Sequence, residues 1–288
     1  MSAVPTDMVA PAPRRVRLFA GTDWSMRVGL AGIALLALAA ALAPLILPGD
    51  PIKLNLTEGL EPPSLTHWFG TDQLGRDVLT RVIYGARIDL QIGAIGVAIP
   101  LAIGLVLGLL AAYFGGWVDA LIGRLIDVVI AFPFLVLVIA IVAMLGPGLI
   151  NLYIAISLVS WVLYARIVRG EVLALRSREY VLAARSLGFG DARIMFRHVL
   201  PNAIAPAFVF AMSDFALDVQ LGATLTFFGL GVQAPTPEWG LMIAEGRNLM
   251  FTAPWIVIFP GLAIIIVSFL VSLIGDGLAD RVRGIDRG

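Results

Sequence analysis

The sequence predicts an all-α integral membrane protein with six transmembrane helices, and three observations support this. Of the 288 residues, 59% are hydrophobic and 14% are charged, whereas soluble domains average about 45–50% and about 25%. The hydrophobic residues also gather in long runs, and a helix needs about 20 apolar residues to cross about 30 Å of hydrocarbon. Finally, the basic residues concentrate in alternate segments between these runs, as in multi-pass proteins.

Six apolar runs divide the chain into a tail of residues 1–27, a six-span domain of residues 28–275 and a tail of residues 276–288. The first run exceeds the usual apolar core of a signal peptide, so we expect a retained anchor. The fourth run is the shortest. The expected spans are Val28 to Leu47, Leu90 to Phe114, Leu125 to Leu145, Leu149 to Ala165, Ala203 to Phe228 and Pro254 to Ile274.

The distribution of basic residues predicts that both termini are cytoplasmic. If the six spans alternate in direction, fifteen of the 20 Lys and Arg residues fall on the side of the termini, and cytoplasmic segments carry the excess of positive charge. Seven of these fifteen lie in the loop 166–202, between the fourth and fifth spans. The segment 48–88, between the first two spans, then faces the outside.

Composition and motifs exclude several other functions. The chain has no Cys and two His residues, which argues against disulfides, thiolate or histidine metal sites and cysteine nucleophiles. A formal net charge of zero gives no reason to expect a nucleic-acid partner. Gly70 and Gly75 do not form a phosphate loop, because no Gly-Lys-Ser or Gly-Lys-Thr follows them. We therefore expect no enzyme active site, no nucleotide site and no cofactor in this chain.

The polar stretch EYVLAARSLGFGDARIMFRHVLPN, residues 179–202, interrupts the apolar sequence and predicts two short helices. Ser177 can cap the first helix and Gly188 can end it. Asp191 can cap the second, and Leu200-Pro201 is expected to stop it before the fifth span. Helices this short are marginal alone in water, so they need a surface to pack on.

One stripe of the first helix suggests what that surface is. Tyr180, Ala183, Ala184 and Leu187 follow at helical spacing, and the small alanines would let another surface approach closely. A basic loop lying on anionic lipid is the simpler explanation. A docking element for a soluble partner is the alternative, favoured because the stripe lacks the broad apolar face that binds lipid.

The pattern of this stretch resembles the EAA motif of ATP-binding-cassette (ABC) importer permeases: Ala183-Ala184, three residues, Gly188, then Leu200-Pro201. Leu182 stands where the motif has Glu, and His198 where it has Ile. Tyr180-Val181 with Ala183-Ala184-Arg185 resembles the dipeptide, oligopeptide and nickel branch. Four further stretches resemble its C-type permeases: GTDQLGRDVLTR, DVVIAFPFLVLVI, FFGLGVQAPTPEWG and GDGLADRVR.

The resemblance implies a type I importer permease fold in a bacterial plasma membrane, with coupling helices that dock on an ATPase subunit. It implies a homologous second permease forming a heterodimer, two ABC ATPase subunits that bind ATP and Mg²⁺, and an extracytoplasmic substrate-binding protein. For segment 48–88, membrane anchoring and contact with that protein both stay open. The implied coupling residues are Tyr180, Ala183, Ala184, Arg185, Leu187, Gly188, Leu200 and Pro201.

Asp214 and Asp218, one turn apart in the fifth span, are the candidates for a translocation path, because ionisable groups in a membrane helix are costly and mark functional sites. Burial against polar atoms of neighbouring helices is the equal alternative. The resemblance favours short peptides or similar solutes and leaves the substrate open. An ion-coupled secondary transporter, with these carboxyls as coupling groups, is the rival; the chain shows no inverted repeat that would support it.

Overall fold

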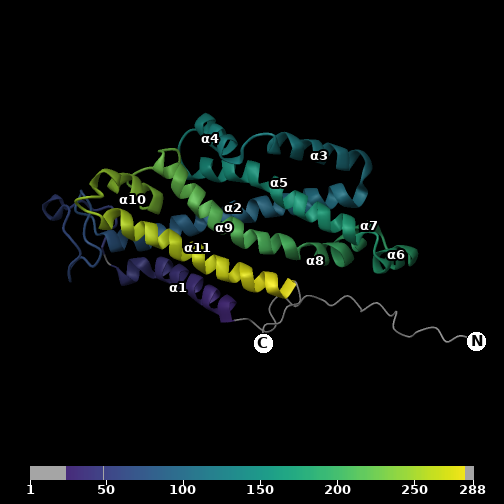
Figure 1. The fold of residues 1–288 in the computed structure, drawn as a ribbon, viewed down its shortest axis with the longest axis horizontal. Coiled ribbons are helices and arrows are strands. Elements are labelled where there is room, and N and C mark those ends of the chain that lie inside the picture. Colours follow the sequence, from purple (N-terminus) through teal and green to yellow (C-terminus); the bar gives the residue numbers. More distant parts are fainter. Residues whose placement is uncertain (1–23, 48, 283–288) are drawn as a thin grey trace, which may run out of the picture.

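The computed structural model describes residues 24–47 and 49–282, and it is an elongated bundle of helices (Figure 1). The predicted tails lie largely outside the described residues. Within these described residues, five helices are long and apolar enough to span a membrane, and a bent pair supplies a sixth span if its two helices count as one. The five are α1 (Trp24–Ile46), α2 (Val78–Phe114), α5 (Leu149–Leu175), α9 (Ala205–Phe227) and α11 (Trp255–Val282).

The third expected span is wrong as a continuous helix. In its place α3 (Gly116–Ile130) and α4 (Phe134–Leu145) meet at 87°. Pro133 stands at the break, directly before α4. A proline has no N–H to donate and restricts the residue before it to extended conformations, so helices end ahead of it.

Two spanning helices, α2 and α5, exceed their predicted lengths by ten residues or more. α2 has 37 residues and would measure about 55 Å, well over the hydrocarbon thickness. It starts at Val78, where the side chain of Asp77 caps it by accepting from Thr80 N (2.7 Å). α5 runs ten residues past Ala165, so the loop that was expected over 166–202 begins only at Arg176.

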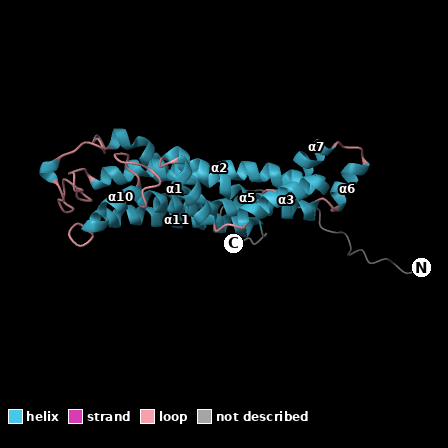
Figure 2. Cartoon of the chain, turned by 90° about the horizontal axis from the view of Figure 1, so that it is seen from above, coloured by secondary structure: helices cyan, strands magenta, loops and turns pink. Residues whose placement is uncertain are grey.

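Small residues allow the helices to pack closely. α2 lies centrally and contacts α1, α5 and α9, while α11 packs against α1 and α9 (Figures 1 and 2). At Gly104 of α2, an added Cβ would overlap Tyr164 of α5; at Gly29 of α1, it would lie 2.6 Å from the carbonyl of Leu270. Glycines at such crossings let membrane helices approach without a side chain between them.

The short elements gather at the two ends of the bundle (Figure 1). One end carries the segment 49–77 with the turn η2 (Leu56–Glu58), the helix α10 (Trp239–Gly246) and the turn η4 (Arg247–Leu249). The other end carries α6 (Glu179–Ser186), α7 (Asp191–Ile194), η3 (Met195–Val199) and α8 (Leu200–Ala203). The start of α1 and the end of α11 point toward the α6 end.

A buried ion network fastens the segment 49–77 to the bundle. Asp72 accepts from Arg76 Nε and Arg81 Nη1, both at 2.6 Å, and both arginines also reach Glu245 of α10, at 2.9 and 2.8 Å. Asp72, Arg76 and Arg81 are buried. Each charge has a partner of opposite sign, which offsets the cost of removing it from water.

Buried polar contacts also hold the loop before α10. Glu238 caps α10 by accepting from the N–H groups of Gly240 and Leu241 (2.9 and 2.7 Å). Trp239 is fully buried, and its Nε1 donates to the carbonyl of Val82 (2.9 Å). Trp239 therefore anchors this loop inside the protein.

Candidate functional site

The helix α6 ends in a turn that depends on Gly188, the glycine that follows the helix. Gly188 has φ +79°, its N–H donates to Arg185 O (3.0 Å), and Phe189 N–H donates to Ala184 O (3.2 Å). These two bonds with a left-handed glycine between them form a Schellman motif. The predicted helix end is therefore confirmed. The predicted cap at Ser177 is wrong, since the helix starts one residue later, with Arg178 in the cap position and no side-chain bond.

The two faces of α6 differ from the predicted stripe. Val181 and Ala184 are buried against the rest of the chain. Ala183 is exposed, as are Leu182 (49%) and Leu187 (73%). Ala184 thus turns inward, and the apolar or small residues exposed on the other face are Leu182, Ala183 and Leu187. Tyr180 is half-buried between the two faces, and burial raises the pKa of its phenol.

The second half of the loop is helical for longer than predicted. Asp191 begins α7, but its carboxylate accepts from Tyr113 Oη of α2 (2.6 Å) and does not cap the helix. Leu200-Pro201 does not stop the helix either. Pro201 has no N–H, and the chain accommodates this with the π-helical turn η3 just before it; α8 then leads through Ile204 into α9.

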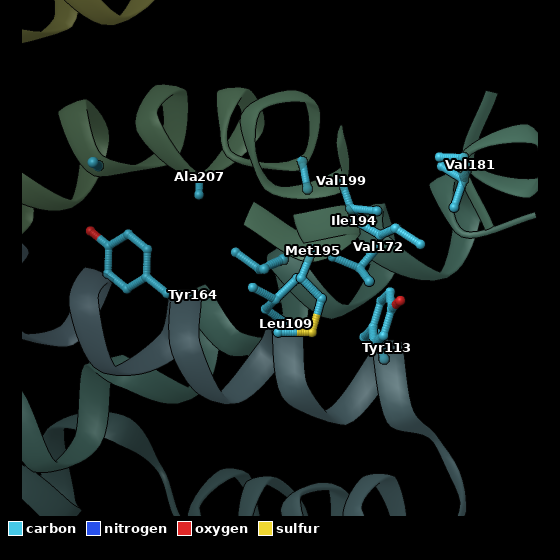
Figure 3. Close-up of a cluster of buried hydrophobic side chains, with 14 residues drawn as sticks. Leu109, Tyr113, Tyr164, Val172, Val181, Ile194, Met195, Val199 and Ala207 are labelled. Carbon is cyan, nitrogen blue, oxygen red and sulfur yellow. The ribbon is translucent and has the colours of Figure 1, made fainter. Parts of the chain in front are cut away.

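Apolar packing joins this loop to α2 and α5. Val181, Ile194, Met195 and Val199 of the loop lie in one buried cluster with Leu109 of α2 and neighbouring residues (Figure 3). Polar bonds add to it: Arg176 Nη1 donates to Ala112 O (2.8 Å), and Arg185 lies over the Tyr113 ring at 5.8 Å. A displacement of α6 would therefore reach the end of α2 directly.

Asp214 and Asp218 lie side by side in the structure, one turn apart on α9, and both are buried, at 5% and 1% exposed. Tyr164 Oη of α5 donates to Asp214 Oδ2 (2.7 Å). Asp218 Oδ2 has no hydrogen-bond partner among the described residues. Both carboxyls line a cavity of about 360 Å³ between α4, α5 and α9.

Sequence reasoning missed several of these contacts. Tyr113 and Tyr164 sit in apolar runs and attract no notice there, although a tyrosine inside a membrane helix needs a partner for its hydroxyl. The network around Asp72 was also missed. Its signal was available in GTDQLGRDVLTR, where charges of both signs alternate at helical and turn spacing.

Fold and sites together define a multi-pass helical membrane protein with a short, partly exposed helix, α6, at one end and a cavity beside two acidic side chains of α9. Residues 104–284 match the family described as the inner membrane component of binding-protein-dependent transport systems. The chain belongs to this family. The prediction that the chain is an importer permease with a type I fold is confirmed. Its relatives favour an ATP-driven importer over an ion-coupled transporter.

Its relatives include permease proteins of bacterial transport systems. It is 46% identical to the dipeptide transport system permease protein of Alkalihalophilus pseudofirmus, over 88% of this chain and 84% of the relative. It is 44% identical to the glutathione transport system permease protein of Pectobacterium atrosepticum, over 77% and 74%. A di/tripeptide transport system permease protein of Pseudomonas aeruginosa is 45% identical, over 88% and 86%.

Two solved structures share the fold. The inward-facing MetNI methionine ABC transporter gives a TM-score of 0.57 at 18% sequence identity, covering 73% of this chain and 98% of that one. An amino acid ABC transporter determined with histidines gives 0.54 at 18% identity, covering 72% and 94%.

Proposed function

We propose that this chain and a second, homologous but non-identical permease form the membrane path of an ATP-driven importer for short peptides or similar small solutes. Two ABC ATPase subunits would bind ATP and Mg²⁺ and drive it, and an extracytoplasmic binding protein would deliver the solute. The permease names of its relatives support the peptide class. The observation that carries the proposal is an exposed helix, α6, fastened by its other face to the ends of the spanning helices.

In this proposal α6 docks on an ATPase subunit through Leu182, Ala183 and Leu187, which are exposed apolar or small residues. Arg185 flanks this surface. Tyr180 and Ala184 hold the helix on the bundle, and Gly188 fixes its angle to the chain that follows. Leu200 and Pro201 begin α8 and pass the displacement into α9.

Movement of the docked helix would reach two spanning helices by separate routes. One route is the bond from Tyr113 of α2 to Asp191, and the other is the helical path from α7 through η3 and α8 to α9. A switch of this kind requires contacts that differ between two states. The ATPase would supply that difference by closing when it binds ATP.

The proposed orientation places the α6 end, the start of α1 and the end of α11 in the cytoplasm. The excess of arginine on this side supports it. The segment 49–77 and α10 would then face the outside of a bacterial plasma membrane, where a binding protein could contact them and where lipid would surround the spans.

Asp214 and Asp218 would lie beside the translocation path, because α9 presents polar side chains on its open face. Ser213, Gln220 and Thr224 are exposed on this helix. Polar groups facing lipid are unfavourable, so membrane proteins turn them toward protein or a water-filled cavity. A water-filled path between this chain and the second permease would keep these polar side chains away from lipid and would place them beside the solute.

The docking surface can be tested by purifying the tagged chain from its native membrane in mild detergent and identifying the proteins that remain bound. We expect two ATPase subunits and a second permease. Ala183→Trp should release the ATPases and keep the permease, because the large ring blocks close approach. Ala183 is the informative position, since a bulky residue at the buried Ala184 would disturb α6 itself.

The matched control is Ala120→Trp, the same change at an exposed position on α3, which should leave the complex intact. An Ala183→Trp protein that keeps its ATPases and transports normally would contradict the proposed docking surface. A lone chain that moves solute without ATP would instead establish the ion-coupled alternative.

A further inference from the structure

Among the described residues, no cation lies in an ion pair with the two carboxyls of α9. The structure records no ion pair to Asp214 or Asp218 among the described residues, in contrast to the network around Asp72, where every acid has an arginine. A charged side chain at the centre of a membrane helix costs about 2.5–3.5 kcal/mol on insertion scales. A buried carboxylate without a cationic partner is therefore costly, and a ligand that brings a cation into contact with it would offset that cost.

The cavity beside the pair has the size and lining of a small-ligand site. Its volume of about 360 Å³ is at the lower end of the usual range of about 300–1,000 Å³. Apolar side chains form most of the wall, and its polar side chains all belong to α9. The wall includes Phe134 of α4, Leu163 of α5 and Phe210 of α9, together with Asp214 and Asp218.

The described neighbouring helices give Asp218 no hydrogen-bond donor. Tyr164 donates its hydroxyl to Asp214 and so satisfies one oxygen of that residue. Asp218 receives no such bond, and its Oδ2 lies where α9 passes Gly96 of α2; a Cβ at Gly96 would overlap this oxygen. The glycine makes room for the carboxyl without giving it a donor.

We infer that this cavity is a subsite for a single cationic group of the transported solute, an ammonium, held by Asp218 with Asp214 beside it. The inference rests on the proposed function. An ammonium carries three donors and a positive charge, which match an unpartnered carboxylate. A metal ion fits less well, because no group of three or more metal-binding acidic or imidazole side chains occurs in the described part of the chain.

The site would act on a solute in transit. The cavity can take the end of a small solute, and Phe134, Leu163 and Phe210 form an apolar wall beside the two carboxyls. One unpartnered acid favours a solute with one free amine over a neutral solute of the same shape. The site therefore adds a selection step inside the membrane, after any selection by a binding protein.

The test compares two solutes that differ only in this group: Ala-Ala, and lactyl-alanine, in which a hydroxyl replaces the ammonium. Uptake of each is measured in proteoliposomes that contain the purified transporter with its bound subunits and binding protein. The binding protein is the same for every variant, so a change in the ratio of the two uptakes reports on the permease. The variants are Asp218→Asn, Asp218→Glu and, as a control buried acid outside the cavity, Asp89→Asn.

We expect the wild-type transporter to prefer Ala-Ala, and Asp218→Asn to reduce that preference by about tenfold or more, the effect of losing one charge-assisted hydrogen bond. Asp218→Glu should keep most of the preference. Asp89→Asn should keep the full ratio of the two uptakes, even if less of this variant protein accumulates.

Equal loss of both uptakes in Asp218→Asn, or no preference in the wild type, would overturn the subsite and leave the importer intact. ATP hydrolysis without uptake of either solute would overturn the peptide class and the subsite with it. Uptake driven by a proton gradient in the absence of ATP would overturn both and assign the carboxyl pair to proton coupling.

Discussion

At the residue scale, His67 shows how one side chain holds the segment 49–77 to the start of α2. Its Nδ1 lies 3.0 Å from Asp77 Oδ2, and its Nε2 lies 3.3 Å from Glu58 Oε2. The hydrogen bond to Asp77 raises the pKa of this imidazole above 6.5, against an opposing effect of burial. Asp77 also caps α2, so the protonated histidine ties the segment to the helix start.

The raised pKa predicts a pH dependence of stability. The folded protein binds the proton more tightly than the unfolded chain, so the contribution of His67 is complete below the unfolded pKa of about 6.5 and is lost as pH rises through the folded pKa. His67→Gln should remove this dependence. Thermal unfolding of the purified protein, measured from about pH 5 to about pH 8, should show a falling midpoint for the wild type relative to His67→Gln. Parallel curves for the two proteins would contradict the prediction.

Single residues were predictable from the sequence where their role is local. Gly188 was identified because a glycine after a short amphipathic helix ends that helix through bonds within its own turn. Tyr113 and Tyr164 were not, because their partners Asp191 and Asp214 lie 78 and 50 residues further along the chain. Helical spacing places Ala184 in the outward stripe, because spacing defines the faces of a helix without telling which face the rest of the chain covers.

At the element scale, composition predicts where the spans lie, whereas local chemistry decides where each helix begins, ends or breaks. Hydropathy alone joins α3 and α4 into one span, since no charge interrupts residues 128–145. Pro133 breaks that span, whereas Pro201 is accommodated by the π-helical turn η3 and Pro100 lies inside α2. The difference depends on whether neighbouring elements replace the lost hydrogen bond, which the sequence does not state.

The end of α6 gives a prediction at this scale. Gly188→Ala places a Cβ at φ +79°, where nothing lies within 4 Å, so the penalty is conformational and not steric. A left-handed residue with a Cβ costs about 1–2 kcal/mol. Hydrogen exchange of the backbone amides at position 188 and at Phe189 should therefore be about 5–30-fold faster. Uptake should fall because the docking helix loses its fixed angle.

Gly190→Ala is the matched control, two residues away. Gly190 has φ −67°, which any residue adopts, and it too has nothing within 4 Å. Its amide exchange and uptake should resemble those of the wild type. If both substitutions reduce uptake equally, the loop depends on glycine for flexibility, and the Schellman turn is not the feature that matters.

At the scale of the whole molecule, the two ends differ in construction. The α6 end is held mainly by apolar packing with α2, α5 and α9, and it exposes Leu187. The opposite end is held by buried ion pairs from Asp72 to Arg76 and Arg81, and onward to Glu245. Apolar packing permits sliding between elements, while a network of directional bonds resists it. We therefore expect the α6 end to move during transport and the 49–77 end to stay rigid.

The assignment of these ends to the two sides of the membrane can be measured directly, because the chain has no Cys. A cysteine at Leu65, which is 96% exposed in the segment 49–77, should react with a membrane-impermeant thiol reagent in intact spheroplasts. A cysteine at Leu187 should react only after the membrane is opened, and one at the buried Val181 should react in neither case while the protein is folded. Labelling of Leu187→Cys but not Leu65→Cys in intact spheroplasts would reverse the orientation. No cytoplasmic ATPase could then reach α6, and the proposed coupling would fail with it.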